Sequence, residues 1–213
     1  MSENSKKVAQ VLLEIGAVKL SVKNPFQYAS GRVGPIYCDN RLILSNVPAR
    51  ETILEIMADQ AKSFETDHPY EVVAGVATAG IPHGSFLAYL LTKPMIYIRS
   101  SPKGHGLKKL IEGELTPGAN VLVVEDLVNS GKSSLKAIKT IAEQGGNPVG
   151  LQCIVNYQLS GVEEMFGKEN CPIISATDFD SIVAVAASSG RVEAGEVLLL
   201  KDWHANPENW NAS

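Results

Sequence analysis

The sequence is poor in cysteine, and its three cysteines form no recognisable pattern. Cys38, Cys153 and Cys171 are scattered along the chain, and none belongs to a C-x-x-C pair. The four histidines show no metal-ligand spacing either. We therefore expect a chain from a reducing compartment that has no disulfide framework and builds no metal site from its own side chains.

Long apolar runs and concentrated positive charge are also missing. No apolar stretch approaches the ~20 residues that a membrane-spanning helix requires, and the first residues, MSENSKKVAQ, lack the apolar core of a secretory signal. The formal net charge is -4, and basic residues cluster only from Arg99 to Lys109, which argues against a nucleic-acid-binding surface. We expect a cytoplasmic protein that binds neither membranes nor nucleic acids.

The apolar residues that are present suffice for one substantial core. The chain has 213 residues, of which 45% are hydrophobic and 20% are charged, as in an ordinary globular domain. We expect residues 1–213 to form a single domain. Within it we distinguish an N-terminal segment over residues 1–47, an α/β core over residues 48–190, and a C-terminal helix and tail over residues 191–213.

Short apolar runs alternate with helical stretches along the core. The runs EVVAGV, PMIYIR, NVLVVED, PVGLQCIV and PIISA are typical of strands that are buried on both faces. Helical spacing and helix-ending residues predict helices around them: Val8 to Ile15, Pro48 to Phe64, residues 82–91 and 133–144, a segment ended by Gly190, and Val197 to Trp203. This alternation predicts a mostly parallel sheet covered by helices on both sides.

Two further local features carry predictions. Thr177 and Asp180 have the spacing of a capping box for the helix that Gly190 ends. Residues 99–118, RSSPKGHGLKKLIEGELTPG, are polar and punctuated by glycine, so we expect one long interval without regular structure. Such an interval is usually either a functional lid or disordered.

The stretch VLVVEDLVNSGKSS, Val121 to Ser134, ends like a nucleotide-binding P-loop but lacks its first glycine. The pattern G-x-x-x-x-G-K-[ST] has a glycine five residues before Gly131, where this chain has Asp126, preceded by Glu125. Two carboxylates would repel a triphosphate. A turn followed directly by a helix aims several backbone N–H groups at one point, and Ser130, Ser133 and Ser134 add hydroxyl donors, so this turn suits a single phosphate.

Glu125 and Asp126 precede this turn at the expected strand end. Carboxylates accept hydrogen bonds from hydroxyl groups, and a ribose presents two hydroxyls side by side. The acidic pair and the anion-binding turn together therefore describe a ribose 5-phosphate site. The alternative interpretation is a solvated strand end followed by an ordinary helix cap. Lys132 at the helix start favours the site, because a cation there is unfavourable unless an anion lies nearby.

This stretch resembles the phosphoribosyl pyrophosphate (PRPP) signature of type I phosphoribosyltransferases. Three further segments occur in the order and spacing of orotate phosphoribosyltransferases: FQYASGRVGPIYCDNR (Phe26 to Arg41), GVATAGIPHG (Gly75 to Gly84) and IRSSPKGHG (Ile98 to Gly106). The resemblance covers nearly the whole chain and is to the stand-alone bacterial form. It implies the type I phosphoribosyltransferase fold, with a small hood formed largely by the N-terminal segment and a long flexible catalytic loop. It also implies a homodimer in which this loop reaches the neighbouring subunit's site.

The resemblance further implies a reaction: orotate and PRPP give orotidine 5′-monophosphate and pyrophosphate, in UMP biosynthesis. Mg²⁺ would be the cofactor, held mainly by PRPP and water with no direct protein ligand. The catalytic residues would be Arg99, Lys103 and His105, whose positive charge stabilises the leaving pyrophosphate. His105 would act either as a general acid or through its charge alone. The alternative for KGHG is a solvated polar loop.

The remaining site residues are carried over from the same motifs. PRPP would be bound by the three catalytic residues and by Glu125, Asp126, Leu127, Val128, Asn129, Ser130, Gly131, Lys132 and Ser133. The pyrophosphate loop would consist of Ala77, Thr78, Ala79 and Gly80, for which the alternative is a simple tight turn. Orotate would be bound by Ser30, Gly31, Arg32 and Asn129.

The chain departs from the family pattern at several positions. Many members carry lysine where this chain has Ala29 and Ala79, and some carry a lid lysine at Ser100 or an orotate-binding arginine at Tyr157. A usual threonine is replaced by Asn129, and a usual glycine or alanine by Lys132. These departures suggest that, compared with other family members, more of the contacts to orotate come from backbone groups of residues 30–32 and from Asn129.

Two other functions remain open at this stage. One is a phosphoribosyltransferase that acts on another base. The other is a PRPP-sensing regulator that has lost catalysis. Such regulators usually add a DNA-binding segment, but residues 1–47 contain neither a basic patch nor a helix-turn-helix pattern.

Overall fold

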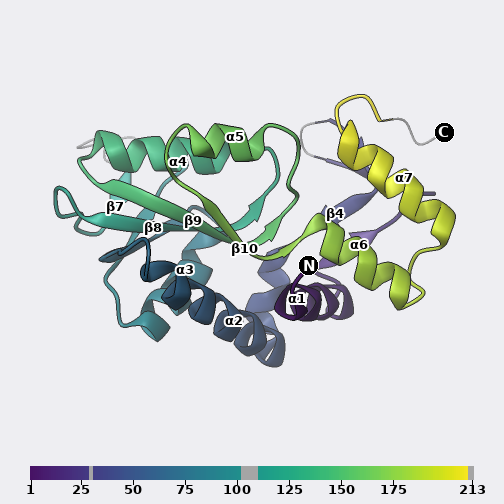
Figure 1. The fold of residues 1–213 in the computed structure, drawn as a ribbon, viewed down its shortest axis with the longest axis horizontal. Helices are drawn as coiled ribbons and strands as arrows, with labels where there is room; N and C mark the ends of the chain where they lie inside the picture. The colour runs from purple at the N-terminus through teal and green to yellow at the C-terminus, as the bar shows by residue number, and fades with distance from the viewer. Residues whose placement is uncertain (29–30, 102–109, 211–213) are drawn as a thin grey trace.

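A six-stranded sheet forms the centre of the protein (Figure 1). The computed structural model describes residues 1–28, 31–101 and 110–210. In the strand order of the sheet, its members are β10 (Ile173–Asp178), β9 (Asn147–Asn156), β8 (Asn120–Val128), β5 (Val72–Val76), β6 (Met95–Ile98) and β7 (Ile111–Glu112). Neighbouring strands are parallel except β6 and β7, which are antiparallel. The prediction of a mostly parallel α/β sheet is confirmed.

Helices cover both faces of this sheet (Figure 1). One face carries α2 (Val47–Glu65) and α3 (Gly80–Leu91), and the other carries α4 (Lys132–Glu143) and α5 (Val162–Gly167). All five residues of β5 are buried as a result, which explains why the sequence of this strand is continuously apolar. Within the described residues, no helix has the length and apolar character needed to cross a membrane.

The two ends of the chain lie together at one side of the sheet (Figure 1). The N-terminal part contains α1 (Glu3–Glu14), the antiparallel pair β1 (Val18–Leu20) and β4 (Ile36–Cys38), the antiparallel pair β2 (Phe26–Gln27) and β3 (Val33–Gly34), and the 3₁₀ helix η1 (Asn40–Ser45). The C-terminal part contains α6 (Phe179–Ser188) and α7 (Ala194–Ala205). These elements form the hood that the sequence predicted, with α7 added to it.

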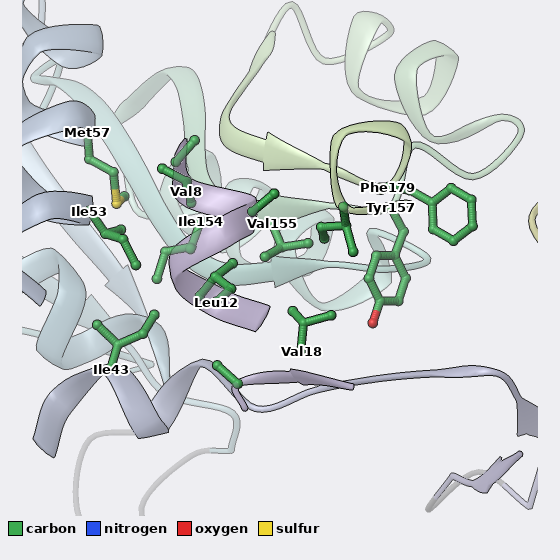
Figure 2. Packing of buried hydrophobic residues seen from close by; sticks show 14 of the residues in the cluster. Val8, Leu12, Val18, Ile43, Ile53, Met57, Ile154, Val155, Tyr157 and Phe179 are labelled. Atoms are coloured by element: carbon green, nitrogen blue, oxygen red, sulfur yellow. The ribbon is translucent and has the colours of Figure 1, made fainter. Parts of the chain in front are cut away.

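A continuous apolar cluster joins the hood to the sheet (Figure 2). Val8 and Leu12 of α1 and Met57 of α2 are fully buried in it, together with Ile43 of η1 and Ile154 of β9. Burying a side chain of this size contributes about 1.5–3 kcal/mol to folding. The hood is therefore held against the edge of the sheet at which the carboxyl ends of the strands lie.

Several predicted boundaries are wrong because tertiary pairing extends the elements. β8 continues to Val128, since Leu127 and Val128 pair with residues of β9, so the acidic pair lies inside the strand and not at its end. Helix α3 begins at Gly80, close to the approximate start expected at residue 82. The interval 99–118 is not free of regular structure, because β7 pairs with β6 there. The short helix α5 was not predicted.

The predicted helix caps near the C-terminus also need correction. The cap of α6 is Asp178, whose side chain accepts a hydrogen bond from the N–H of Ser181 at 2.7 Å. Thr177 does not cap this helix, because its hydroxyl donates to the carbonyl of Ser5 at 2.9 Å in the core. A capping box does occur at α7, between Glu193 and Glu196, and this helix includes the predicted Val197 to Trp203.

Candidate active site

The loops that follow β5, β6 and β8 meet at one edge of the sheet, since β5 pairs with both other strands in parallel. This is the edge at which α/β proteins bind ligands. Two large cavities open there. The cavity beside the loop after β5 has a volume of about 530 Å³ and is lined by Cys38, Asp39, Arg41, Ala77, Thr78, Ala79, Glu125, Asp126, Leu127 and Ser133. We call it the acidic-pair cavity.

The second cavity, of about 770 Å³, lies between the hood, the turn after β8 and the C-terminal segment. We call it the hood cavity. Its lining includes Tyr28 and Arg32 from the hood and Asn129, Ser130 and Lys132 from the turn, and the C-terminal residues Trp203, Ala205, Asn206, Pro207 and Glu208 close it. The turn after β8 therefore contributes residues to both cavities.

The turn between β8 and α4 depends on Gly131. This residue has a φ of +71° and stands at the N-cap of α4, a conformation that a residue with a Cβ atom adopts only with strain. A Cβ atom would also lie 2.8 Å from the ring of Phe166 in α5. Among the described residues, no side chain caps α4, so its first N–H groups remain available for an anion.

Glu125 is buried at the root of this turn, with 6% of its surface exposed. Its Oε1 accepts the N–H of Asp126 at 3.0 Å, and its Oε2 accepts the hydroxyl of Ser134 at 3.4 Å. Burial, helped by the charge of Asp126, raises the pKa of Glu125 to about 9. Glu125 is thus protonated at neutral pH, and in this form its carboxyl group can donate as well as accept a hydrogen bond. In this structure the Ser134 hydroxyl, which the sequence suggested as a donor to an anion, contacts Glu125 instead.

The loop between β5 and α3 packs tightly against β8. A Cβ atom on Gly80 would lie 2.6 Å from the carbonyl oxygen of Val124, so only glycine allows the start of α3 to lie beside the acidic pair. The N–H of Ala77 donates to the carbonyl of Ile98 at 2.8 Å and is therefore engaged within the sheet. Thr78 and Ala79 line the acidic-pair cavity, with the N-terminus of α3 directly behind them.

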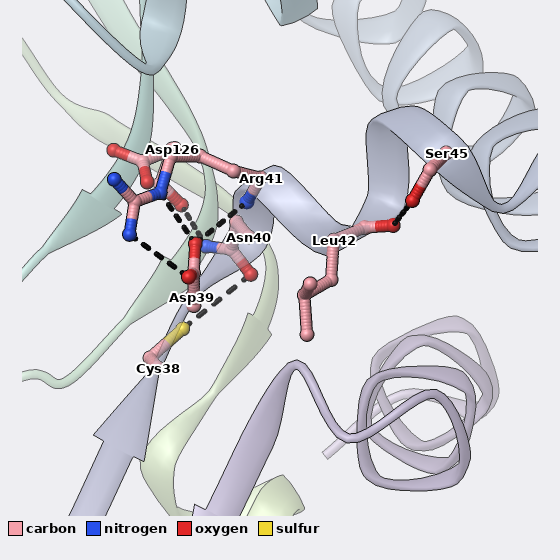
Figure 3. Close-up of polar contacts among 7 residues, drawn as sticks. All are labelled: Cys38, Asp39, Asn40, Arg41, Leu42, Ser45 and Asp126. Atoms are coloured by element: carbon pink, nitrogen blue, oxygen red, sulfur yellow. Dashed lines mark hydrogen bonds and ion pairs between the residues drawn. The ribbon is translucent and has the colours of Figure 1, made fainter.

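Sequence reasoning missed the segment that faces the acidic pair from the hood (Figure 3). Asn40 is fully buried, and its Nδ2 donates to the carbonyl of Asp126 at 2.7 Å. Asp39 accepts hydrogen bonds from Nε and Nη2 of Arg41, at 2.6 and 2.8 Å. The motif IYCDNR was noticed in the sequence, but its partner Asp126 lies 86 residues from Asn40, so the sequence offered no role for it.

The residues expected to bind orotate are only partly brought together. Asn129 and Arg32 line the hood cavity, where Nη2 of Arg32 lies 2.9 Å from Oε1 of Glu208. Gly31 adopts a φ of +82° beside Arg32, and Ser30 lies outside the described residues. Tyr157 is buried and packs edge-on against Trp203, so its side chain does not replace the arginine of other family members.

Comparison with known proteins agrees with this arrangement. A family model described as phosphoribosyl transferase domain matches residues 47–187. The orotate phosphoribosyltransferase of Listeria monocytogenes is 42% identical over 205 residues, which is 96% of this chain and 97% of the relative. The chain belongs to the orotate phosphoribosyltransferase family. The orotate phosphoribosyltransferase of Porphyromonas gingivalis is 40% identical over 210 residues, 99% of each chain.

A solved structure of an orotate phosphoribosyltransferase also matches the fold. The enzyme of Aeropyrum pernix superposes with a TM-score of 0.73 at 27% sequence identity, covering 87% of this chain and 99% of that one. This likeness, together with the sheet and the flanking helices, confirms the predicted type I phosphoribosyltransferase fold.

The other residues expected to bind PRPP in this orotate phosphoribosyltransferase family member lie in different surroundings. Arg99 forms an ion pair with Glu112, with Nη1 and Oε1 3.0 Å apart, and lines a third cavity of about 200 Å³ next to Ala77 and Ser133. Leu127 lines the acidic-pair cavity, whereas the side chain of Val128 is fully buried in the core. Lys103 and His105 lie outside the described residues.

Proposed function

We propose that this protein transfers the phosphoribosyl group of PRPP to orotate, releasing pyrophosphate and forming orotidine 5′-monophosphate for UMP biosynthesis. One observation supports the proposal most strongly. Glu125 and Asp126 lie in β8, the uncapped N-terminus of α4 follows directly after the turn, and the loop after the neighbouring strand β5 lies opposite them. A ribose with a phosphate on one side and a pyrophosphate on the other fits this arrangement.

The turn at residues 129–133 would bind the 5-phosphate through backbone N–H groups at the start of α4. Asp126 would accept one ribose hydroxyl, and the protonated Glu125 would bind the neighbouring hydroxyl as donor or acceptor. These contacts fix the sugar at both ends. The anomeric carbon would then lie between the loop at residues 77–80 and the base, as an in-line displacement needs.

In the reaction the bond from the anomeric carbon to the pyrophosphate oxygen breaks, and both electrons leave with that oxygen. The ring nitrogen of orotate forms the new bond to this carbon and loses its proton, which the released pyrophosphate or water accepts. Negative charge accumulates on pyrophosphate, so cations and a helix N-terminus near it lower the barrier. We assign these roles to Arg99, Lys103 and His105 and to the start of α3, with Lys103 and His105 on a lid that excludes water.

We propose that a magnesium ion binds in this site as a companion of the substrate. In the described part of the chain, no group of three or more His, Cys, Asp or Glu residues could hold a metal ion. Asp126 and Glu125 offer hard oxygen atoms beside the expected sugar, which suits Mg²⁺ that keeps PRPP oxygens and water as its ligands. When bound, the ion would neutralise charge on the pyrophosphate. We also propose a cytoplasmic homodimer, with the lid of one subunit completing the site of the other.

The test is to mix the purified protein with PRPP, Mg²⁺ and orotate and to follow the absorbance of orotate. We expect orotate to be consumed in proportion to the pyrophosphate released. Consumption of uracil or a purine instead of orotate would contradict the substrate. Binding of PRPP without turnover of any base would indicate a sensing protein.

A further inference from the structure

The loop expected to hold pyrophosphate contains no charged side chain. Its residues are Ala77, Thr78, Ala79 and Gly80. The acidic-pair cavity that it lines also contains the carboxyl groups of Asp39, Glu125 and Asp126. Among the described residues of this lining, Arg41 is the sole base. A multiply charged anion in this cavity therefore meets one cation from the described lining itself, Arg41, while Arg99 lines the neighbouring cavity.

Arg41 is held in place by its neighbours (Figure 3). Asp39 accepts both Nε–H and Nη2–H of Arg41, and the pKa of Asp39 is lowered chiefly by this hydrogen bonding, so the pair forms throughout the neutral range. The backbone N–H of Asp39 donates to the carbonyl of Ala17 at 2.7 Å. The next residue, Asn40, is bonded to the carbonyl of Asp126. The segment that carries the guanidinium is thus anchored to β8 itself.

Part of the guanidinium remains available to a ligand. A guanidinium has five N–H donors, and two of them are directed at Asp39, so three remain. The side chain of Arg41 is 65% exposed, against 21% for Asp39, so these donors reach the cavity and solvent. A planar fork of this kind matches phosphate oxygens, which it can bind two at a time.

We infer that Arg41 is a further pyrophosphate-binding residue of this site and that Asp39 is its positioning residue. The inference rests on the proposed function, which supplies pyrophosphate as the ligand. Arg41 shares its cavity with Ala77, Thr78 and Ala79, whereas Arg32 and Asn129 line the hood cavity. Arg41 therefore contacts the leaving group and not the base. Because charge grows on that group during reaction, the contact strengthens towards the transition state.

The test compares Arg41→Gln, Arg41→Lys and Asp39→Asn with the wild type. The matched control is Arg191→Gln, which removes an exposed guanidinium from a separate cavity beside α6. The readouts are the inhibition constant of pyrophosphate, KM for PRPP and for orotate, kcat, and calorimetric binding of magnesium pyrophosphate alone. Circular dichroism and Tm show whether each variant is folded.

We expect Arg41→Gln to raise the inhibition constant of pyrophosphate and the KM for PRPP by about tenfold and to lower kcat, with KM for orotate within about twofold. Arg41→Lys keeps the charge without the fork and should have an intermediate effect. Asp39→Asn should act in the same direction but more weakly. Arg191→Gln should match the wild type in every readout.

Unchanged pyrophosphate inhibition in any folded Arg41 variant would overturn the inference, and so would a rise confined to KM for orotate. If Arg41→Gln does not fold, Arg41→Lys and Asp39→Asn decide by the same criteria. If the wild type does not consume orotate but Arg41→Gln still weakens calorimetric binding of magnesium pyrophosphate, the proposed function fails and the anion site stands. If the wild type turns over orotate and pyrophosphate binding is unaltered in the variants, the inference alone fails.

Discussion

The hydroxyl of Ser134 in α4 donates to Oε2 of Glu125 in β8, at 3.4 Å. The two residues stand on either side of the turn expected to bind the 5-phosphate, nine positions apart. Both side chains are buried, so this contact ties the helix that offers its N-terminus to the strand that offers the acids. In the proposed function this contact would set the spacing between the phosphate and the ribose hydroxyls before substrate binds.

Removing this hydroxyl should loosen that arrangement. Ser134→Ala leaves a buried carboxyl with one partner fewer, and we expect a loss of about 1 kcal/mol in the free energy of unfolding and a higher KM for PRPP. Urea denaturation and initial-rate kinetics measure the two effects. Ser188→Ala is the control, because the Ser188 hydroxyl is exposed and, among the described residues, donates to the carbonyl of Val185 one turn earlier in its own helix. Equal behaviour of both variants would show that the contact has no role.

The raised pKa of Glu125 predicts how stability depends on pH. Its pKa is about 9 in the folded protein, against an ordinary value of 4.5, so between these values the folded state keeps a proton that the unfolded state releases. The contribution of this proton to the free energy of unfolding is complete below pH 4.5 and is lost as pH rises towards 9. The free energy of unfolding then falls by at most about 1.4 kcal/mol per pH unit.

Glu125→Gln cannot ionise, so its free energy of unfolding should fall less steeply with pH than that of the wild type. Urea denaturation from about pH 5 to pH 8.5 gives both curves. Titrating groups that do not interact with Glu125 are the same in both proteins and cancel in the difference between the curves, whereas Asp126 interacts with Glu125 and contributes to that difference. Two parallel curves would mean that Glu125 is not kept protonated by burial.

Gly131 should tolerate no side chain. Gly131→Ala combines the strain of a positive φ with a clash against Phe166, and we expect a loss of about 2–3 kcal/mol in the free energy of unfolding and weaker binding of PRPP. Gly118→Ala is the matched control, since Gly118 has a φ of +81° but a Cβ atom there meets nothing within 4 Å. The difference between the two variants measures the clash. A smaller loss for Gly131→Ala than for Gly118→Ala would contradict this packing.

The shared lid can be tested by mixing two impaired variants. Lys103→Ala removes the proposed lid cation, and Asp126→Asn removes a proposed ribose contact; each alone should lower turnover by orders of magnitude. If the lid acts on the neighbouring subunit, co-expressed chains should recover roughly a quarter of the wild-type activity, because mixed dimers contain one intact site. Co-expression of Lys103→Ala with Lys103→Ala that carries a second tag is the control. The absence of any recovery would contradict a lid that acts between subunits.

The sequence predicted those parts of the candidate site that are contiguous in the chain. The acidic pair and the turn up to Ser133 follow one another, so one motif contained both. The strand VVAGV could be assigned because burial on both faces makes it continuously apolar. These predictions needed only local spacing.

The contacts across the chain could not be predicted in the same way. The bond from Asn40 to Asp126 depends on where the hood lies. β7 has two residues and exists because β6 pairs with it, and α5 has six residues, one of which, Phe166, packs behind Gly131. Thr177 could not cap α6 because α1 takes its hydroxyl. In each case a distant partner decided the structure.

The arrangement of the sugar is tested most directly by a crystal structure with orotidine 5′-monophosphate bound. We expect the phosphate against the backbone N–H groups of residues 129–133 and the two ribose hydroxyls within hydrogen-bond distance of Glu125 and Asp126. A nucleotide whose phosphate lies away from this turn, or whose ribose does not touch the two acids, would contradict the account.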